Sequence, residues 1–301
     1  MTPTRREFLK TAAGMMALPL IGETEMADGI KLPASYYQQF DADFAAGASI
    51  PDRRDKLDVP GEGYGGWKKS EIQISRDHTA VVIMHAWDMG TREEYPGWHR
   101  AVEYIPRADK ICRTVFPKLL KAVRDSHFKL FHVVGGGDYY KNLPGYKPSA
   151  ASQPLEQAKS DPILGKLNAF RAEHVFVGKH NEADVARGFK KLGFPNEARP
   201  LGNEPVAENA EQLFAVCKDM GVNHLIYAGF AINWCLLMSP GGMLDMSRRG
   251  IMCSALRQAV TAVENKETAR KELHKEEALW RVALEFGFVF DVDEFVRAIE
   301  Q

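Results

Sequence analysis

Residues 222–246, VNHLIYAGFAINWCLLMSPGGMLDM, carry the pattern from which the fold and the chemistry are interpreted. The run 222–230 is apolar and contains Ile and Tyr, which is typical of a buried parallel strand. A polar break at Asn233 follows, and Cys235 then opens a second apolar run. A thiol at such a strand-to-helix turn would lie on free backbone N–H groups at the positive end of a helix dipole. That setting lowers a cysteine pKa and supplies oxyanion donors, although the pattern also fits an inert core cysteine.

Composition and charge exclude several function classes. The 301 residues have an ordinary globular composition and fit one large α/β domain or two small ones, with nothing that marks a second core. A net charge of -1 gives no electrostatic reason to expect nucleic acid or an anionic membrane as a partner. The glycine run 135–137 lacks the dinucleotide-binding spacing, so no cofactor is expected.

The four cysteines show no metal-binding spacing. No CxxC or Cys/His motif occurs, which argues against a zinc site. We expect Cys112, Cys217 and Cys253 to lie in the core, although export would allow a disulfide among them.

The N-terminus has the pattern of an export signal. Residues 4–10, TRREFLK, precede an apolar stretch, 11–21, that is too short to span a bilayer. Paired arginines followed by Phe-Leu-Lys resemble the bacterial twin-arginine signal. The resemblance implies that residues 1–27 are a signal for the twin-arginine (Tat) translocation machinery and that the protein is periplasmic. Residues 28–74, rich in Pro, Gly and charge, are expected to be an arm without chemistry, and residues 75–301 the catalytic domain.

Apolar runs alternate with helical patterns along the rest of the chain. This alternation predicts a three-layer α/β/α domain with a mostly parallel, doubly wound sheet of about five or six strands. Pro117 should kink or split a helix, and the sequence Pro-Gly-Gly at 240–242 should bend or delay the helix that follows Cys235. The expected strands are 80–84, 130–134, 175–178, 222–230, 250–256 and 288–290, and the expected helices are 106–126, 183–192, 206–220 and 267–286.

Reactive groups follow three of these strands. His85 and Asp88 follow the first, Lys179 follows 175–178, and Cys235 follows 222–230. Because the carboxyl ends of parallel strands share one edge of the sheet, these groups can converge. A base, a cation and a thiol suit nucleophilic hydrolysis. The alternatives are a solvated Lys179, a structural His85 and an Asp88 that caps a turn.

From residue 79 onward the chain resembles the isochorismatase-like cysteine hydrolase family, which includes nicotinamidases and N-carbamoyl amidases. The family pattern is a strand ending in Asp, a strand ending in Lys, and Gly-x-x-Thr-x-x-Cys-Val at a strand–helix turn. The matches are VGK at 177–179 and GFAINWCL at 229–236. By this resemblance, Phe230–Ala231 is a cis peptide, and the N–H groups of Ala231 and Cys235 form an oxyanion hole.

Two positions depart from the family pattern. His85 stands where the family has its catalytic Asp, and Ile232 stands where it has Thr. The base is therefore either His85, whose ordinary pKa of ~6.5 suits the role, or Asp88. A metal held by His85, Asp88 and His99 is not expected, because the family's Asp-x-His pair is missing.

Two functions from different classes remain. The first is an exported hydrolase that cleaves a small amide, carbamoyl or vinyl-ether substrate through Cys235. Trp87, Phe230 and Trp234 would then line an aromatic substrate pocket, the alternative for each being ordinary packing. The second is a catalytically lapsed family member that serves as a binding or assembly module. The resemblance also allows a homo-oligomer, but no stretch identifies its interface.

Overall fold

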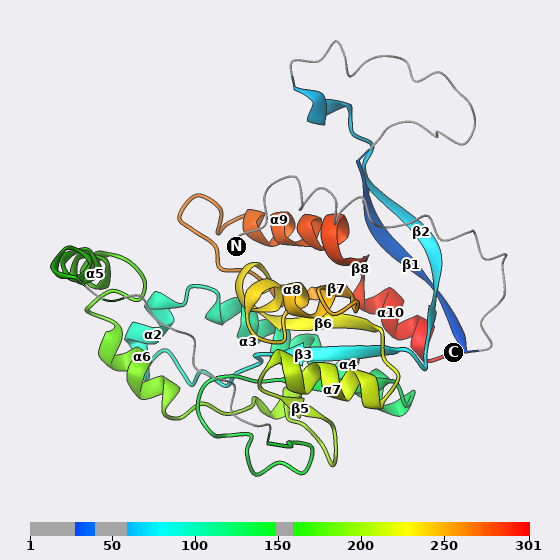
Figure 1. The fold of residues 1–301 in the computed structure, drawn as a ribbon, viewed down its shortest axis with the longest axis horizontal. Helices are drawn as coiled ribbons and strands as arrows, with labels where there is room; N and C mark the ends of the chain where they lie inside the picture. The colour runs from blue at the N-terminus through cyan, green and yellow to red at the C-terminus, as the bar shows by residue number, and fades with distance from the viewer. Residues whose placement is uncertain (1–27, 40–58, 149–158, 160) are drawn as a thin grey trace.

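A mixed eight-stranded sheet forms the centre of the computed structural model, which describes residues 28–39, 59–148, 159 and 161–301 (Figure 1). Its order is β2-β1-β8-β7-β6-β3-β4-β5, and the six strands from β8 to β5 pair in parallel. The strands are β1 (Gly29–Gln38), β2 (Gly66–Ser75), β3 (Thr79–Met84), β4 (Lys129–Val133), β5 (Val206–Ala207), β6 (His224–Phe230), β7 (Met252–Thr261) and β8 (Val289–Phe290).

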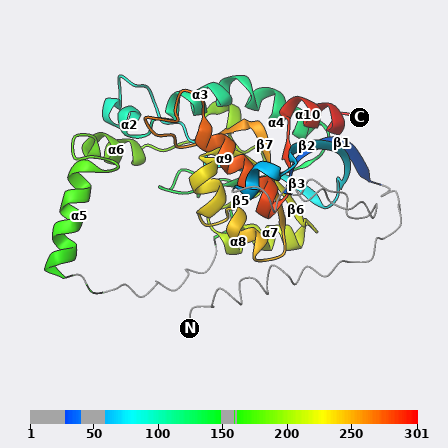
Figure 2. The ribbon, with the colours of Figure 1, turned by 90° about the horizontal axis from the view of Figure 1, so that it is seen from above.

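Helices cover both faces of this sheet. Figure 2 shows α3, α4 and α10 on one side of it and α7 and α8 on the other. Every residue of β3 and β6 is buried, and their side chains alternate between two apolar clusters, one under each helical layer. The three-layer α/β/α fold is therefore confirmed.

The helices are α2 (Pro96–Ala101), α3 (Ile105–Thr114), α4 (Phe116–Asp125), α5 (Pro162–His174), α6 (Glu182–Phe189), α7 (Ala210–Asp219), α8 (Met243–Ser247), α9 (Leu273–Arg281) and α10 (Val292–Ile299). Short 3-10 turns are η3 (Pro60–Gly63) and η4 (Asn196–Ala198).

The sheet is larger than expected because residues 28–74 contribute to it. β1 and β2 pair antiparallel over ten residues each, and Ser35 of β1 pairs with Val289 of β8. The described part of the expected arm is thus mainly an edge hairpin. β2 is mostly polar and exposed, so it lacks the apolar run that marked the central strands.

The expected third strand, 175–178, is wrong. These residues connect α5 to α6, and Val175 and Phe176 are exposed. The parallel strand beside β4 is instead β5, which occupies the start of the expected helix 206–220. Just before β5, the Pro205 carbonyl accepts a hydrogen bond from the His132 N–H of β4. β5 is only two residues long, too short to produce a recognisable period.

The two helix interruptions are confirmed. The segment 106–126 divides at Val115 into α3 and α4, with Pro117 in the first turn of α4, where its missing N–H is tolerated. After β6 a π-helical turn, η5 (Ile232–Leu236), leads to a break at 239–242 before α8. The expected helix 267–286 is α9 continued by a second π turn, η6 (Val282–Phe286).

The expected twin-arginine signal, 1–27, lies outside the described residues. Among the described helices, none has the length and apolar character needed to cross a membrane.

Candidate functional site

Cys235 lies on the π-helical turn that follows β6. The Phe230–Ala231 peptide is cis, as the resemblance implied. The Ala231 carbonyl then accepts hydrogen bonds from the N–H groups of Trp234 (3.2 Å) and Leu236 (3.1 Å), which forms the π turn. Such turns are frequent at functional sites. The helical run from Ile232 ends by 239, so the dipole expected behind the thiol is short.

Cys235 is the accessible thiol of the chain. All four cysteines are free, and Cys235 is half-buried whereas the other three are buried. Burial raises the pKa of Cys112 and of Cys217 to about 12, and it also raises the pKa of Cys253. These three thiols are therefore inert core residues, as expected.

Two contacts fix the cysteine turn to its neighbours. Gly229 has φ of +125°, and a Cβ there would lie 1.9 Å from the Met84 carbonyl oxygen, so this close approach of β6 to β3 requires glycine. On the other side, the Asn233 side chain accepts from the Val263 N–H (2.9 Å) and donates to the Val263 carbonyl (2.8 Å). The turn is thus held between the ends of β3 and β7.

The structure brings the Lys179 segment toward the cysteine turn, but not on a strand. Phe176, in the connector between α5 and α6, packs edge-on against Trp234, with ring centroids 5.6 Å apart. Lys179 follows three residues later, within roughly 11 Å of Phe176 along the chain. Its side chain is exposed and forms no ion pair with a described residue.

His85 follows β3 at the same edge of the sheet. Met84 pairs with Gly229, so His85 is level with Phe230. Its backbone has φ of 50°, an uncommon left-handed conformation for a buried non-glycine residue. The ring stacks on Trp87 (4.8 Å between centroids), and a Cβ added at Gly135 would lie 3.0 Å from Nε2.

Burial keeps the His85 imidazole neutral. Desolvation lowers its pKa to about 4, although a hydrogen bond with the Val134 backbone opposes the shift. Its Nδ1 is buried and has no hydrogen-bond partner among the described residues. One ring nitrogen therefore lacks a partner, and the imidazole is a weak base.

Asp88 caps a turn. Its carboxylate accepts from the Gly90 N–H (3.0 Å), and its own N–H donates to the Gly193 carbonyl (2.9 Å). Its side chain is exposed. These contacts favour the structural interpretation of Asp88.

The three aromatic residues expected in a substrate pocket differ in position. Phe230 is 1% exposed and stacks on Phe116 in the core, so it is a packing residue. Trp87 is half-buried and donates to the Tyr139 hydroxyl (2.9 Å). Trp234 is 43% exposed beside the cysteine and is the one best placed to touch a substrate.

A charged cluster near the cysteine turn was not expected from the sequence. Arg107 donates to Thr261 Oγ1 (3.0 Å) and to the Ala262 carbonyl (3.1 Å), and Thr261 pairs with Phe230 across β7 and β6. Arg107 is also paired with Glu103 and Glu272 (2.8 and 3.2 Å), so its charge is neutralised. Because these residues come from α3 and the segment before it, from the end of β7 and from the start of α9, no local motif identifies them.

Among the described residues, no group of three or more His, Cys, Asp or Glu side chains could hold a metal ion. His99 contacts the carbonyls of Met89 and Gly90 (3.3 and 3.2 Å).

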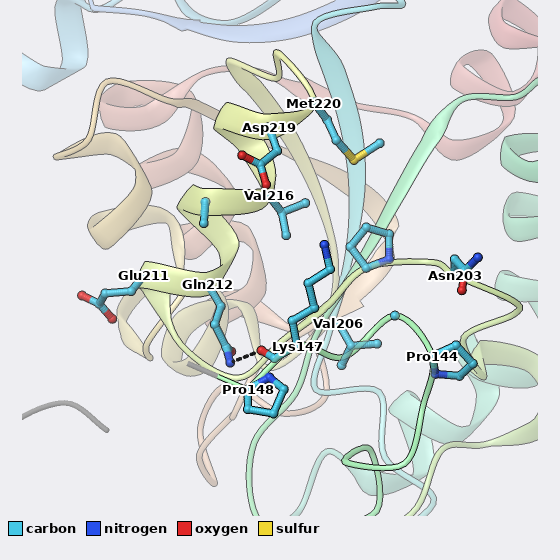
Figure 3. A pocket seen from close by; sticks show the side chains of 13 residues that line it. Pro144, Lys147, Pro148, Asn203, Val206, Glu211, Gln212, Val216, Asp219 and Met220 are labelled. Carbon is cyan, nitrogen blue, oxygen red and sulfur yellow. Dashed lines mark hydrogen bonds between the residues drawn. The ribbon is translucent and has the colours of Figure 1, made fainter. Parts of the chain in front are cut away.

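A cavity of about 500 Å³ lies elsewhere, between α7 and the loop before α5 (Figure 3). The Gln212 amide donates to the Lys147 carbonyl (3.0 Å) at its wall. None of the residues expected to be catalytic lines this cavity.

No protein-family model and no curated protein matches the sequence. The solved structures similar to this chain include a cysteine hydrolase from Pseudomonas syringae pv. phaseolicola 1448A (TM-score 0.44, 15% identity, 75% of this chain and 94% of that chain). An isochorismatase-like hydrolase from Alkaliphilus metalliredigens has a TM-score of 0.43 at 14% identity over 73% of this chain and 98% of that one. N-carbamoylsarcosine amidase from Thermoplasma acidophilum has a TM-score of 0.39 at 14% identity over 72% of this chain and 98% of that one.

Proposed function

We propose that this chain is an isochorismatase-like cysteine hydrolase in which Cys235 is the nucleophile. The observation that carries the proposal is the cysteine turn itself: the single accessible thiol of the chain lies on a π turn that follows a buried parallel strand and a cis peptide. The substrate class is a small amide, carbamoyl compound or vinyl ether, with Trp234 and Phe176 as aromatic contacts beside the thiol.

For an amide substrate the chemistry has two stages. The Cys235 thiolate attacks the carbonyl carbon, and the N–H groups of Ala231 and Cys235 stabilise the oxyanion. The C–N bond then breaks, the amine leaves with a proton, and a thioester remains on sulfur. Water hydrolyses the thioester to the acid and regenerates the thiol. Lys179, at the end of the connector that meets Trp234, is the proposed cation.

Among the proposed catalytic groups, the base His85 is the one least suited to its role. An ordinary thiol has a pKa of about 8.5, whereas burial lowers the His85 pKa to about 4. Transferring the proton from such a thiol to His85 would cost about 6 kcal/mol. His85 therefore works as a base only if the substrate supplies a hydrogen-bond acceptor or a negative charge that stabilises the protonated imidazole.

This mismatch favours a second candidate function, a lapsed enzyme that keeps the fold as a binding module. A screen of amides, carbamates and vinyl ethers with wild type, Cys235→Ala and His85→Asp separates the two. A working enzyme gives wild-type turnover that Cys235→Ala abolishes. Turnover that appears only in His85→Asp supports the lapsed alternative. Turnover that survives Cys235→Ala contradicts the nucleophile.

We also propose export to the periplasm by the twin-arginine machinery, based on the paired arginines Arg5 and Arg6. Replacing both by Lys should leave the protein in the cytoplasmic fraction of a bacterial host. Unchanged fractionation would contradict the signal.

A further inference from the structure

Helix α5 projects from the body of the molecule and has no covering element among the described residues (Figure 2). All thirteen of its residues are exposed, including large apolar side chains: Ile163 is 73%, Leu167 59% and Phe170 62% exposed. Of the sixteen exposed large apolar side chains in the described part of the chain, four lie on this helix; Val175 and Phe176 follow in the connector, where Phe176 packs on Trp234. This concentration marks an unpartnered surface rather than scattered exposure.

The helix begins at a well-formed cap but has little support beyond it. Asp161 accepts hydrogen bonds from the N–H groups of Ile163 (2.7 Å) and Leu164 (2.8 Å), and Pro162 occupies the first turn. An isolated helix of thirteen residues is marginal in water, and Gly165 weakens it further. A packing partner for its apolar side is therefore needed to hold it.

The apolar side has the spacing of a coiled-coil seam. Ile163, Leu167, Phe170 and His174 follow one another at intervals of four, three and four residues, the interval pattern of a and d positions. At 3.6 residues per turn these four positions fall within an arc of about 60°. The seam is narrow, which suits one helix as the partner rather than a broad apolar surface.

We propose that α5 pairs antiparallel with α5 of a second copy of this chain, forming a symmetric dimer. The charges that flank the seam select this arrangement. In the antiparallel pair Leu167 packs on the partner's Phe170, and Lys166 lies opposite the partner's Glu173, so that two opposite-charge pairs form by symmetry. A parallel pair would instead place Lys166 opposite the partner's Arg171, a repulsive contact.

The interface of one short helix per copy is small, so the dimer is weak and dissociates in the micromolar range. Analytical ultracentrifugation of the full chain over a concentration series measures it. Phe170→Asp should weaken the dimer at least 100-fold, because it places a charge in the seam of both copies. Leu201→Asp, at an apolar residue exposed to a similar degree (53%) in another loop, is the matched control and should leave the dimer unchanged.

Charge exchange tests the pairing itself. Lys166→Glu and Glu173→Lys should each weaken the dimer about tenfold, because each creates two like-charge contacts. The double variant should restore wild-type association, since the opposite-charge pairs are re-formed. These residues lie outside the cysteine turn, so the outcome does not depend on catalysis.

Three results would overturn the proposal. A wild-type chain that stays monomeric at concentrations up to about 1 mM excludes self-association. A dimer that Phe170→Asp leaves unchanged uses another surface. A double variant that fails to restore the dimer contradicts the antiparallel pairing of Lys166 with the partner's Glu173. Hydrogen exchange gives a second readout, because the amides of α5 should become protected as the concentration rises.

Discussion

Replacing His85 by Asn should remove much of the protein's sensitivity to acid. Burial lowers the pKa of His85 to about 4, whereas the unfolded chain has the ordinary value of 6.5. Between these two values the unfolded chain binds a proton at this position and the folded chain does not. Acidification through this window therefore favours unfolding, and the stability present above pH 6.5 is lost as the pH falls toward 4.

The magnitude follows from the two pKa values. Each pKa unit corresponds to about 1.4 kcal/mol. Protonation of His85 in the unfolded chain should therefore lower the free energy of unfolding by about 3 kcal/mol between pH 7 and pH 4. Urea unfolding followed by circular dichroism at both pH values gives the loss for wild type and for His85→Asn. The loss should be smaller by about 3 kcal/mol in the variant.

Two controls make the assay specific. His224 is buried at the other end of the sheet with its pKa also lowered to about 4, so His224→Asn should reduce the acid sensitivity by a similar amount. His180 is exposed, so His180→Asn removes no buried group and should behave as wild type. If His85→Asn and wild type lose equal stability on acidification, the His85 imidazole is not buried and neutral, and its pKa does not make it a weak base.

Three further predictions concern the frame of the site. Gly229→Ala should destabilise the fold by about 3 kcal/mol, seen as a lower urea midpoint, because its Cβ would meet the Met84 carbonyl at a positive φ. Glu204→Gln should lower the free energy of unfolding by about 3 kcal/mol at pH 7. Burial opposes the charge of Glu204, but hydrogen bonds from His132 and Arg124 outweigh it and hold the pKa of this carboxyl at about 2. The difference in stability between wild type and variant should shrink as the pH falls from 4.5 toward 2, and a constant difference would contradict this explanation. Asn233→Ala should lower the free energy of unfolding by about 2 kcal/mol, because it removes both hydrogen bonds between the cysteine turn and Val263. Urea unfolding measures the loss of stability, and hydrogen exchange of the turn detects its release.

The centre of the fold could be predicted from the sequence because its signals are local. β3 and β6 are continuous apolar runs, buried on both faces, and the glycine and cysteine spacing after β6 identifies the turn. β5 could not be predicted, since two residues carry no period. The run at 175–178 resembles a strand in its side chains, but no neighbouring strand pairs with it.

The site was only partly predictable for a related reason. A motif can report residues that are close in the chain, as for Cys235 and the Phe230–Ala231 peptide. Tyr104 and Arg107, at the start of α3, reach the neighbourhood of the turn only through tertiary packing. The pKa of His85 likewise depends on burial beside Trp87 and Gly135, which its own sequence position does not reveal.

The rate at which Cys235 reacts with iodoacetamide at neutral pH, measured by mass spectrometry of the native protein, tests whether this thiol is an activated nucleophile. We expect one equivalent to be incorporated at Cys235, faster than into a free model thiol, while Cys112, Cys217 and Cys253 label only after denaturation. Labelling of Cys235 at or below the rate of the model thiol would contradict an activated nucleophile at this turn.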